Sequence, residues 1–248
     1  MQNKYSILLH YSEIALKLNN RSFFEKIFIK NIKNHVFDLK YSKIKLIAAR
    51  VIIENIDINQ WQEYSIRLKS IMGLQNATLV LEVESKLDQI KAASKILIDK
   101  LDFKSFRITS KRNDKTFQHT SNDVNVKVGE YVQKLTNKPV NLNFPDINII
   151  IEILKNVTFV GIDRILGFSG LPAKSQEKGL SLISSGIDSP VASFEMIKRG
   201  VDLDFIHFHS YPAINKQSIN NVKKIINCLT DYQLSARLYL VPLLNIQQ

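Results

Sequence analysis

The chain has 248 residues and a mass of 28.5 kDa, with 34 lysines and arginines against 23 aspartates and glutamates, a net charge of +11. A hydrophobic fraction of 45% and a charged fraction of 23% exclude a disordered chain, and a single cysteine, Cys228, excludes a disulfide framework and a cysteine-rich zinc site. No apolar run is long enough to cross a bilayer and the first residues do not form a secretory signal, so we expect a cytoplasmic protein with no membrane partner.

The first elements in chain order predict an α+β module. A strand is expected at 5–9, a helix at 21–38, strands at 44–48 and 51–54, a helix at 59–72 and a strand at 77–83. The order strand, helix, strand, strand, helix, strand is the ferredoxin-like split βαβ arrangement. We therefore assign residues 1–75 to a ferredoxin-like domain.

The helix at 21–38 has two distinct sides at 100° per residue. One side is mostly apolar and faces a core, and it gathers Phe24, Phe28, Asn31, Ile32 and His35. The opposite side is basic and gathers Lys26, Lys30 and Lys33. A basic stripe suits a helix that contacts RNA phosphates, and a solvated lysine face explains the same spacing equally well.

The middle of the chain predicts a small α/β module. A helix is expected at 87–101, a strand that begins at Phe106, a helix at 121–135 after an N-cap signal, and strands at 147–154 and 158–163. We assign residues 76–167 to this second domain. Residues 168–178 lie in the one stretch rich in glycine, proline and serine, and they are expected to be a linker.

The last part of the chain alternates strands and helices. Strands are expected at 180–183, 203–208 and 237–241, with helices at 191–199 and 218–229 between them. This alternation predicts a parallel, doubly wound sheet over residues 179–248. The fold class is therefore α/β, with three strands of the doubly wound sheet present.

The distribution of charge favours a polyanionic partner. Residues 1–60 carry 10 basic and 5 acidic groups, residues 61–170 carry 16 and 12, and residues 171–248 carry 8 and 6. Such an excess is typical of proteins that bind nucleic acids. Surface lysines that keep the protein in solution are an equally good interpretation of composition alone.

The motif that carries chemistry is the hexapeptide Ser-Ser-Gly-Ile-Asp-Ser at residues 184–189. It lies between a predicted strand and a predicted helix, where backbone N–H groups and the helix N-terminus surround a phosphate. It is neither a Walker motif nor the three-glycine dinucleotide fingerprint. A tight strand-to-helix turn without a ligand is the alternative.

The hexapeptide resembles the PP-loop pyrophosphatase motif Ser-Gly-Gly-x-Asp-Ser of ATP-dependent adenylating enzymes. With its flanking residues 182–192, 198–200 and 207–210, it resembles the tRNA 4-thiouridine synthetases, tRNA sulfurtransferases that some organisms also use in thiamine biosynthesis. The resemblance extends to residues 12–17, to 111–117 and to 170–172. It implies a ferredoxin-like domain, a THUMP RNA-binding domain and the N-terminal part of a PP-loop domain whose other half, with the sulfur-carrying cysteines, lies beyond residue 248.

The resemblance also implies roles for individual residues. Asp188 and Ser189 match the catalytic end of the loop, and the positions that bind ATP match Leu182, Ile183, Ser184, Ser185, Gly186, His207 and Phe208. Lys111, Arg112 and Lys115, expected to follow a strand, match the RNA-facing part of the THUMP domain and add to the lysines of the first helix. Ser185 replaces a glycine of the family, which would cost about 1 kcal/mol or more if this position needs a positive φ or very close approach to a phosphate. If it needs neither, the added hydroxyl is harmless or serves as a donor.

The function that the resemblance implies is sulfur transfer to tRNA. ATP with Mg²⁺ would adenylate a uridine, and sulfur from a persulfide donor such as a cysteine desulfurase would then replace the adenylate. A tRNA-binding THUMP protein without catalysis, and sulfur transfer for thiamine without RNA, are the alternatives; a homodimer is left open. No metal site made of side chains alone is expected, since His207 and His209 lack a third ligand at metal spacing, and Cys228 is expected to be a buried small hydrophobe.

Overall fold

The structure is a computed structural model that describes residues 4–211 and 216–243. The chain forms two compact units. One unit comprises residues 1–9, 40–61 and 76–165, and the other comprises residues 10–39, 62–75 and 166–248. The described helices include none that is long and apolar enough to cross a membrane.

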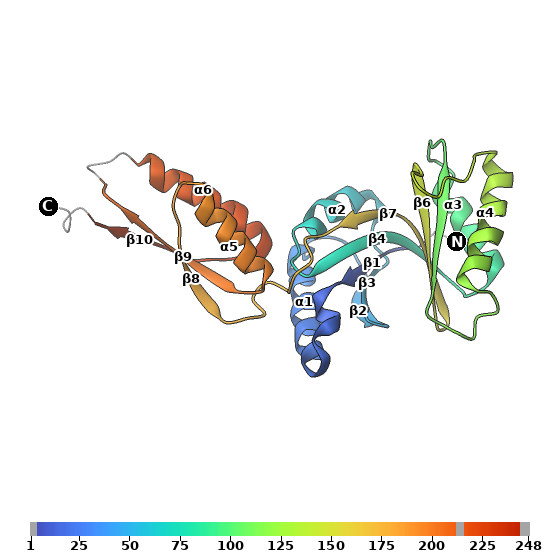
Figure 1. The fold of residues 1–248 in the computed structure, drawn as a ribbon, viewed down its shortest axis with the longest axis horizontal. Coiled ribbons are helices and arrows are strands. Elements are labelled where there is room, and N and C mark those ends of the chain that lie inside the picture. The colour runs from blue at the N-terminus through green and yellow to red at the C-terminus, as the bar shows by residue number, and fades with distance from the viewer. Residues whose placement is uncertain (1–3, 212–215, 244–248) are drawn as a thin grey trace. The chain divides into compact units, whose positions relative to one another are not determined.

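The elements follow the predicted order closely (Figure 1). The strands are β1 (Tyr5–Tyr11), β2 (Lys43–Ile47), β3 (Arg50–Glu54), β4 (Leu74–Val83), β5 (Phe106–Arg112), β6 (Ile147–Leu154), β7 (Val157–Leu166), β8 (Lys178–Leu182), β9 (Asp202–His209) and β10 (Leu238–Pro242). The α-helices are α1 (Arg21–His35), α2 (Trp61–Lys69), α3 (Leu87–Ile98), α4 (Ser121–Thr136), α5 (Asp188–Lys198) and α6 (Gln217–Gln233). Three short 3₁₀ turns, Glu13–Leu16, Leu18–Asn20 and Ile58–Gln60, precede helices.

The first seven strands form one sheet in the order β2-β3-β1-β4-β7-β6-β5. Strand β3 pairs antiparallel with β1 and β2, β6 pairs antiparallel with β7, and β5 pairs parallel with β6. The order β2-β3-β1-β4 is that of a ferredoxin-like module, as predicted. The sequence suggested two separate modules, but β4 and β7 are neighbours in one sheet, because sequence pattern identifies a strand without identifying its partner.

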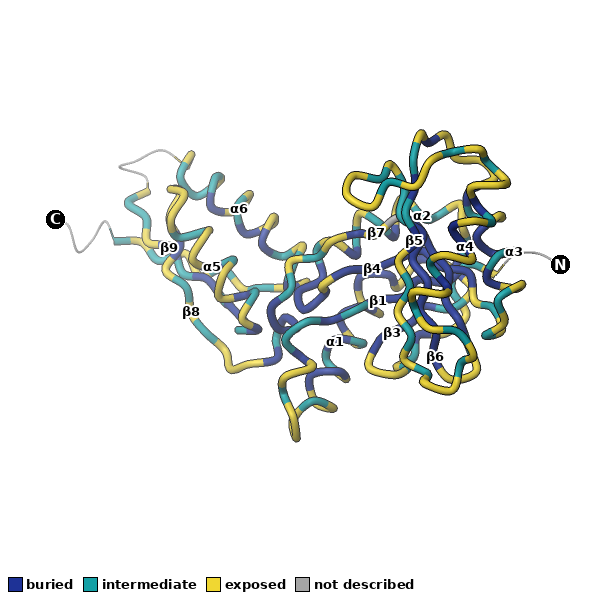
Figure 2. Tube along the Cα trace, turned by 45° about the vertical axis from the view of Figure 1, so that its right-hand side comes forward, coloured by how far each residue is buried: buried dark blue, intermediate teal, exposed yellow. Residues whose placement is uncertain are grey.

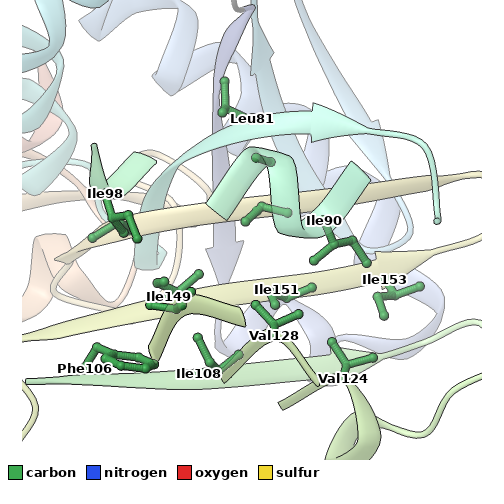
Figure 3. Close-up of a cluster of buried hydrophobic side chains, with 14 of the residues drawn as sticks. Leu81, Ile90, Ile98, Phe106, Ile108, Val124, Val128, Ile149, Ile151 and Ile153 are labelled. Carbon is green, nitrogen blue, oxygen red and sulfur yellow. The ribbon is translucent and has the colours of Figure 1, made fainter. Parts of the chain in front are cut away.

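Helices α3 and α4 pack on the same face of β5 and β6 (Figure 3). Ile149 and Ile151 alternate along β6 and are fully buried, and Val124 and Val128 on α4 contribute to the same core from one helical face. Each such side chain contributes about 1.5–3 kcal/mol by its burial. A capping box at the start of α4, in which Thr120 and Asp123 exchange hydrogen bonds, fixes where the helix begins.

The last three strands form a separate parallel sheet in the order β10-β9-β8, as predicted. Helices α5 and α6 lie on the same side of it (Figure 1), and Phe205 of β9 is fully buried against Ile197 of α5 and Val222 of α6. Helix α5 begins at Asp188, three residues before the predicted start. Pro190 is tolerated there because N–H groups of the first turn have no acceptor within the helix.

Helix α1 has the two sides that its sequence predicts. The five residues assigned to its core side are all buried, and Lys26, Lys30 and Lys33 are all exposed. The buried polar side chains find backbone partners: Asn31 Nδ2 donates to the carbonyl oxygen of Ala173 at 2.9 Å, and His35 Nε2 lies 3.1 Å from that of Asp231. The helix ends at His35 rather than at residue 38, because Val36 leaves helical geometry and a turn follows.

Candidate functional site

The Ser-rich loop lies where parallel strands end. Strand β8 ends at Leu182, α5 begins at Asp188, and the intervening residues form the loop. Because β8, β9 and β10 are parallel, their carboxyl ends lie at the same edge of the sheet. Ligands of open α/β sheets bind at this edge.

Serine hydroxyl groups form hydrogen bonds within the loop. The backbone N–H of Ser184 donates to Ser189 Oγ at 2.9 Å, and the two serine hydroxyls lie 3.0 Å apart. The N–H of Gly186 donates to Ser184 Oγ at 3.3 Å, and Ser193 Oγ donates to the carbonyl oxygen of Ser189 at 2.7 Å. The loop therefore holds its shape with its own side chains.

The two residues at the tip of the loop are under no backbone strain. Ser185 is not among the described residues with a positive φ, so serine carries no backbone penalty at this position. A Cβ added to Gly186 would meet Ser184 Oγ at 3.5 Å and nothing nearer, and the backbone of Gly186 is outside the left-handed region. The fold thus does not require glycine at 186, whereas close approach of a ligand to its backbone would.

Asp188 is exposed at the first position of α5. A carboxylate at a helix N-terminus is favoured by the helix dipole, but it repels a phosphate unless a cation lies between them. The described residues include no group of three side chains able to hold a metal ion. The residues fit a Mg²⁺ ion that takes its further ligands from phosphate oxygens and water, the usual way this ion binds beside phosphates.

The residues expected on the nucleotide side differ in what they offer. Leu182 is 68% exposed and Phe208 is 41% exposed, so both offer apolar surface. Ile183 is buried in the core, so its side chain does not line the site. His207 is also buried: its Nδ1 lies 2.8 Å from the carbonyl oxygen of Ile183, and its Nε2 lies 3.2 Å from Ser218 Oγ. His207 therefore fixes the end of β8 to β9 and α6.

The residues expected to face RNA on the second module lie at the end of β5 and in the loop after it. Lys111 and Lys115 are exposed. Lys111 and Arg112 were expected to follow the strand, but they are the last two residues of β5. They pair in register with Glu152 and Ile153 of β6. The strand continues because β6 offers backbone partners as far as these positions.

Arg112 uses its guanidinium within the protein. Its Nη1 donates to the carbonyl oxygens of Phe117 at 3.1 Å and His119 at 3.2 Å. The side chain is half-buried, which suits a residue that shapes the loop after β5. Lys111 and Lys115 are thus the better candidates for phosphate contacts in this segment.

Sequence reasoning missed a buried ion pair that supports the same loop. Arg50 and Glu152 are each 4% exposed, and Arg50 Nε donates to Glu152 Oε2 at 2.7 Å. Arg50 Nη2 also donates to Asn113 Oδ1 at 3.0 Å, and Asn113 N donates to the carbonyl oxygen of Ile153. Glu152 was the signal in the sequence for this ion pair. It is a carboxylate in an otherwise apolar strand, and a buried charge needs a partner.

Cys228 lies on α6 and is exposed, so the expectation that it is buried is wrong. The core side of α6 is formed by Val222, Ile226 and Leu229, and Cys228 faces away from it. A single small residue gives too weak a signal to place it on one side of a helix.

The chain has a ferredoxin-like module, a second α/β module and then a parallel sheet with a Ser-rich strand-to-helix loop. This combination defines a multidomain protein of the PP-loop type. Comparison with known families agrees in all three parts. Residues 6–78 match the ThiI ferredoxin-like domain, residues 84–163 match the THUMP domain, and residues 174–248 match the thiamine biosynthesis protein (ThiI) model. The chain is thus similar, in three successive regions, to domains found in ThiI-like proteins.

Individual relatives resemble the chain over nearly its whole length. It is 34% identical to a probable tRNA sulfurtransferase of Alkaliphilus oremlandii and 36% identical to one of Clostridium kluyveri, with 98% of the chain covered in both. The match covers 63% of each relative, so the chain spans less than two thirds of their length.

Two solved structures have the same fold. A 4-thiouridine synthetase in complex with RNA and ATP superposes with a TM-score of 0.83 and 28% identity, over 99% of this chain and 64% of that one. The protein PH1313 of Pyrococcus horikoshii superposes with a TM-score of 0.82 and 26% identity, over 96% of this chain and 78% of that one.

Proposed function

We propose that this chain is part of an ATP-dependent tRNA sulfurtransferase that forms 4-thiouridine. The observation that carries the proposal is the loop at residues 184–189, which lies at the carboxyl edge of a parallel sheet and has a glycine that the fold itself does not require. The related 4-thiouridine synthetase was crystallised with both RNA and ATP, the two ligands that this proposal needs.

The chemistry proceeds in two steps. In the first, a bond forms between O4 of the uridine and the α-phosphorus of ATP, the α–β phosphoric anhydride bond breaks, and pyrophosphate leaves. In the second, the terminal sulfur of a persulfide, supplied by a donor such as a cysteine desulfurase, attacks C4 of the base, and AMP leaves with the former O4. A thiol then attacks the donor sulfur and breaks the S–S bond that joins it to the base, which releases 4-thiouridine; the disulfide formed is reduced by an external dithiol. The protein contributes by orienting the reactants and by stabilising charge on the phosphates.

Each part of the site has a role in this scheme. Loop N–H groups other than those of Ser184 and Gly186, together with the N-terminus of α5, bind the β- and γ-phosphates, and Ser184 and Ser189 keep the loop in shape. Asp188 would hold Mg²⁺, which would offset the negative charge of the phosphates. Leu182 and Phe208 provide apolar surface for the adenine ring.

The RNA-binding modules provide the basic groups that position the tRNA. The exposed Lys26, Lys30 and Lys33 of α1 form one basic stripe, and the exposed Lys111 and Lys115 flank a second segment that Arg112 shapes. Lysine contacts to phosphates fix the register of an RNA without reading its sequence, and folded RNA is recognised largely by shape.

A second candidate is a tRNA-binding protein that has no turnover by itself. The observation that favours it is the sheet of three strands, because helices α5 and α6 cover one of its faces and apolar side chains on the other are exposed. In this case the chain binds tRNA and ATP weakly and releases no pyrophosphate.

Release of pyrophosphate from Mg·ATP in the presence of tRNA tests the proposal. We would compare the chain, the chain extended by any coding sequence that follows it, and the variant Asp188→Ala in whichever form is active. Asp88→Ala is the matched control, because Asp88 is also an exposed aspartate in the first turn of a helix, α3. We expect Asp188→Ala to lower the rate at least 100-fold with tRNA affinity unchanged, and Asp88→Ala to be silent. Binding of tRNA without turnover in any form supports the second candidate.

A further inference from the structure

A pocket at the start of α1 has no role in the proposed function. It has a volume of about 480 Å³ and lies between two segments of the same compact unit. Its lining residues are Asn20, Phe23 and Phe24 at the start of α1 and residues 174–177 before β8. The stretches 18–20 and 176–178 are exposed (Figure 2), so the pocket opens to solvent. None of the described residues that line it belongs to the loop at 184–189.

Hydrogen bonds hold the side of the pocket that residues 174–177 form. Gln176 N donates to the carbonyl oxygen of Gly200 at 2.9 Å. Lys174 Nζ donates to Ser235 Oγ at 2.8 Å and lies 3.2 Å from a carboxylate oxygen of Asp202. The ammonium group of Lys174 is therefore engaged within the protein, and its contacts fix this side of the pocket.

The start of α1 has donors that the helix itself does not use. Asn20 is the N-cap residue, but its side chain forms no capping hydrogen bond, and the first turn holds no acidic residue. The N–H groups of Ser22 and Phe23 have no acceptor within the helix because of their position in its first turn. Together with the positive end of the helix dipole, these donors attract an anion.

Ser175 is a second, independent observation that points to a ligand. It lines the pocket and is 6% exposed, and its Oγ has no hydrogen-bond partner among the described residues. A buried hydroxyl without a partner destabilises a fold. Gly200 makes room for this hydroxyl, since a Cβ there would lie 2.4 Å from Ser175 Oγ. The fold thus keeps a buried hydroxyl that it does not itself use.

We propose that this pocket binds a phosphate group. The phosphate oxygens accept hydrogen bonds from the N–H groups of Ser22 and Phe23 and from the hydroxyl of Ser175. The exposed side-chain amides of Asn20 and Gln176 add donors at the mouth of the pocket. A phosphate fits these donors because it carries negative charge and several acceptor oxygens, whereas a cation would meet the positive end of the helix dipole.

Charged side chains of both signs lie around the pocket. Lys17 Nζ lies 5.1 Å from the ring centroid of Phe24 and adds positive charge, whereas the exposed carboxylate of Glu177 opposes an anion. The phosphate belongs either to an RNA backbone or to free inorganic phosphate, and the pocket recognises the group that both share. This inference goes beyond the proposed function, because the site is separate from the loop at 184–189 and binds phosphate whether or not ATP is turned over.

Titration of the full chain with inorganic phosphate, followed by NMR of the backbone amides, tests the inference. We expect saturable shifts of the Ser22, Phe23 and Ser175 amides, and the Gly186 amide reports separately on phosphate at the loop. Ser175→Ala should raise the dissociation constant measured at Ser22 and Phe23 at least fivefold. Its melting temperature should not fall, because the substitution removes a buried hydroxyl that has no partner among the described residues.

Matched variants separate phosphate binding from general effects of the substitutions. Thr78→Val removes another buried hydroxyl that has no partner in the described part of the chain, at a residue that is 1% exposed and lies in the other unit. It should leave the dissociation constant unchanged. Glu177→Gln should lower the constant at least twofold, whereas Glu130→Gln, at an exposed glutamate of α4, should not change it.

The same measurements with tRNA identify the source of the phosphate. If RNA supplies it, tRNA shifts the same three amides and Ser175→Ala weakens tRNA binding at least threefold. If free phosphate is the ligand, tRNA leaves these amides unshifted and binds both proteins equally. Either result supports the pocket as a phosphate site. With inorganic phosphate, no saturable shift at Ser22 and Phe23, or an unchanged dissociation constant in Ser175→Ala, would overturn the inference. So would a lower melting temperature of Ser175→Ala.

Discussion

The substitution Gly186→Ala separates what the fold requires from what a ligand requires. In the structure the added methyl group meets Ser184 Oγ at 3.5 Å, an ordinary contact, and the backbone of Gly186 is outside the left-handed region. Replacing a glycine by alanine at a compatible position stabilises a protein by about 0.4–1 kcal/mol, because the unfolded chain has fewer conformations. For a chain of this size that is a rise in melting temperature of about 1–4 °C.

The effect on ATP should have the opposite sign. If phosphate oxygens approach the backbone of Gly186, the methyl group occupies part of their space, and we expect the dissociation constant for Mg·ATP to rise at least tenfold, about 1.4 kcal/mol. Isothermal titration calorimetry measures this constant, and a thermal melt measures stability on the same sample. The prediction is thus a protein that is slightly more stable and binds ATP more weakly.

Gly170→Ala is the control for an ordinary structural glycine. Gly170 has φ +77°, and a Cβ there would lie 2.3 Å from the carbonyl oxygen of Lys198, so this substitution should lower the melting temperature by several degrees. If Gly186→Ala also lowered the melting temperature, or if it left ATP affinity within twofold, the argument that this glycine makes room for a ligand would be refuted.

Three further predictions concern RNA binding and pH. Affinity for tRNA should fall steeply with salt, and Lys30→Ala should reduce the log–log slope by about 1; an unchanged slope in filter-binding titrations would remove α1 from the interface. Lys111→Ala should weaken tRNA binding and leave the melting temperature unchanged. Arg112→Ala should lower both the tRNA affinity and the melting temperature, because its guanidinium donates to two loop carbonyls. Equal behaviour of the two variants in paired binding and melting experiments would contradict these different roles. Burial and a hydrogen bond with Glu25 raise the pKa of Tyr11 to about 12, so the folded state holds the phenolic proton more tightly than the unfolded state. The free energy of unfolding should therefore fall as pH rises from about 10 to about 12. Tyr11→Phe should reduce that fall in urea titrations, and an identical loss in both proteins would show that this group does not cause it.

Much of the fold follows from local pattern. The ferredoxin-like order of the first elements, both sides of α1 and the parallel alternation after residue 178 are all as the sequence predicts. In each case periodicity decides, since buried residues recur every three or four positions in a helix and every two in a strand. The predicted helix ends were less accurate: α1 ends at His35, before residue 38, and α5 begins at Asp188, before residue 191, because the apolar pattern does not mark where helical backbone geometry begins and ends.

Long-range features were not predictable from the sequence. That β4 and β7 are neighbours, which joins two modules in one sheet, depends on which strand edges meet. The Arg50–Glu152 pair joins residues 102 positions apart, so no local spacing connects them. At the candidate site, the hexapeptide is a local motif and can be identified from the sequence. The burial of Ile183 and His207 could not be predicted, because it depends on how β8, β9 and α6 pack.

The function proposed for this chain is ATP-dependent formation of 4-thiouridine in tRNA. The most direct test is the amount of 4-thiouridine in total tRNA, measured by liquid chromatography and mass spectrometry, from cells that lack the gene and from the same cells complemented with it. The account predicts that the modified base is lost in the mutant, that the unaltered gene restores it, and that a gene carrying Asp188→Ala does not. An unchanged amount of 4-thiouridine in the mutant, or full restoration by Asp188→Ala, would contradict the account.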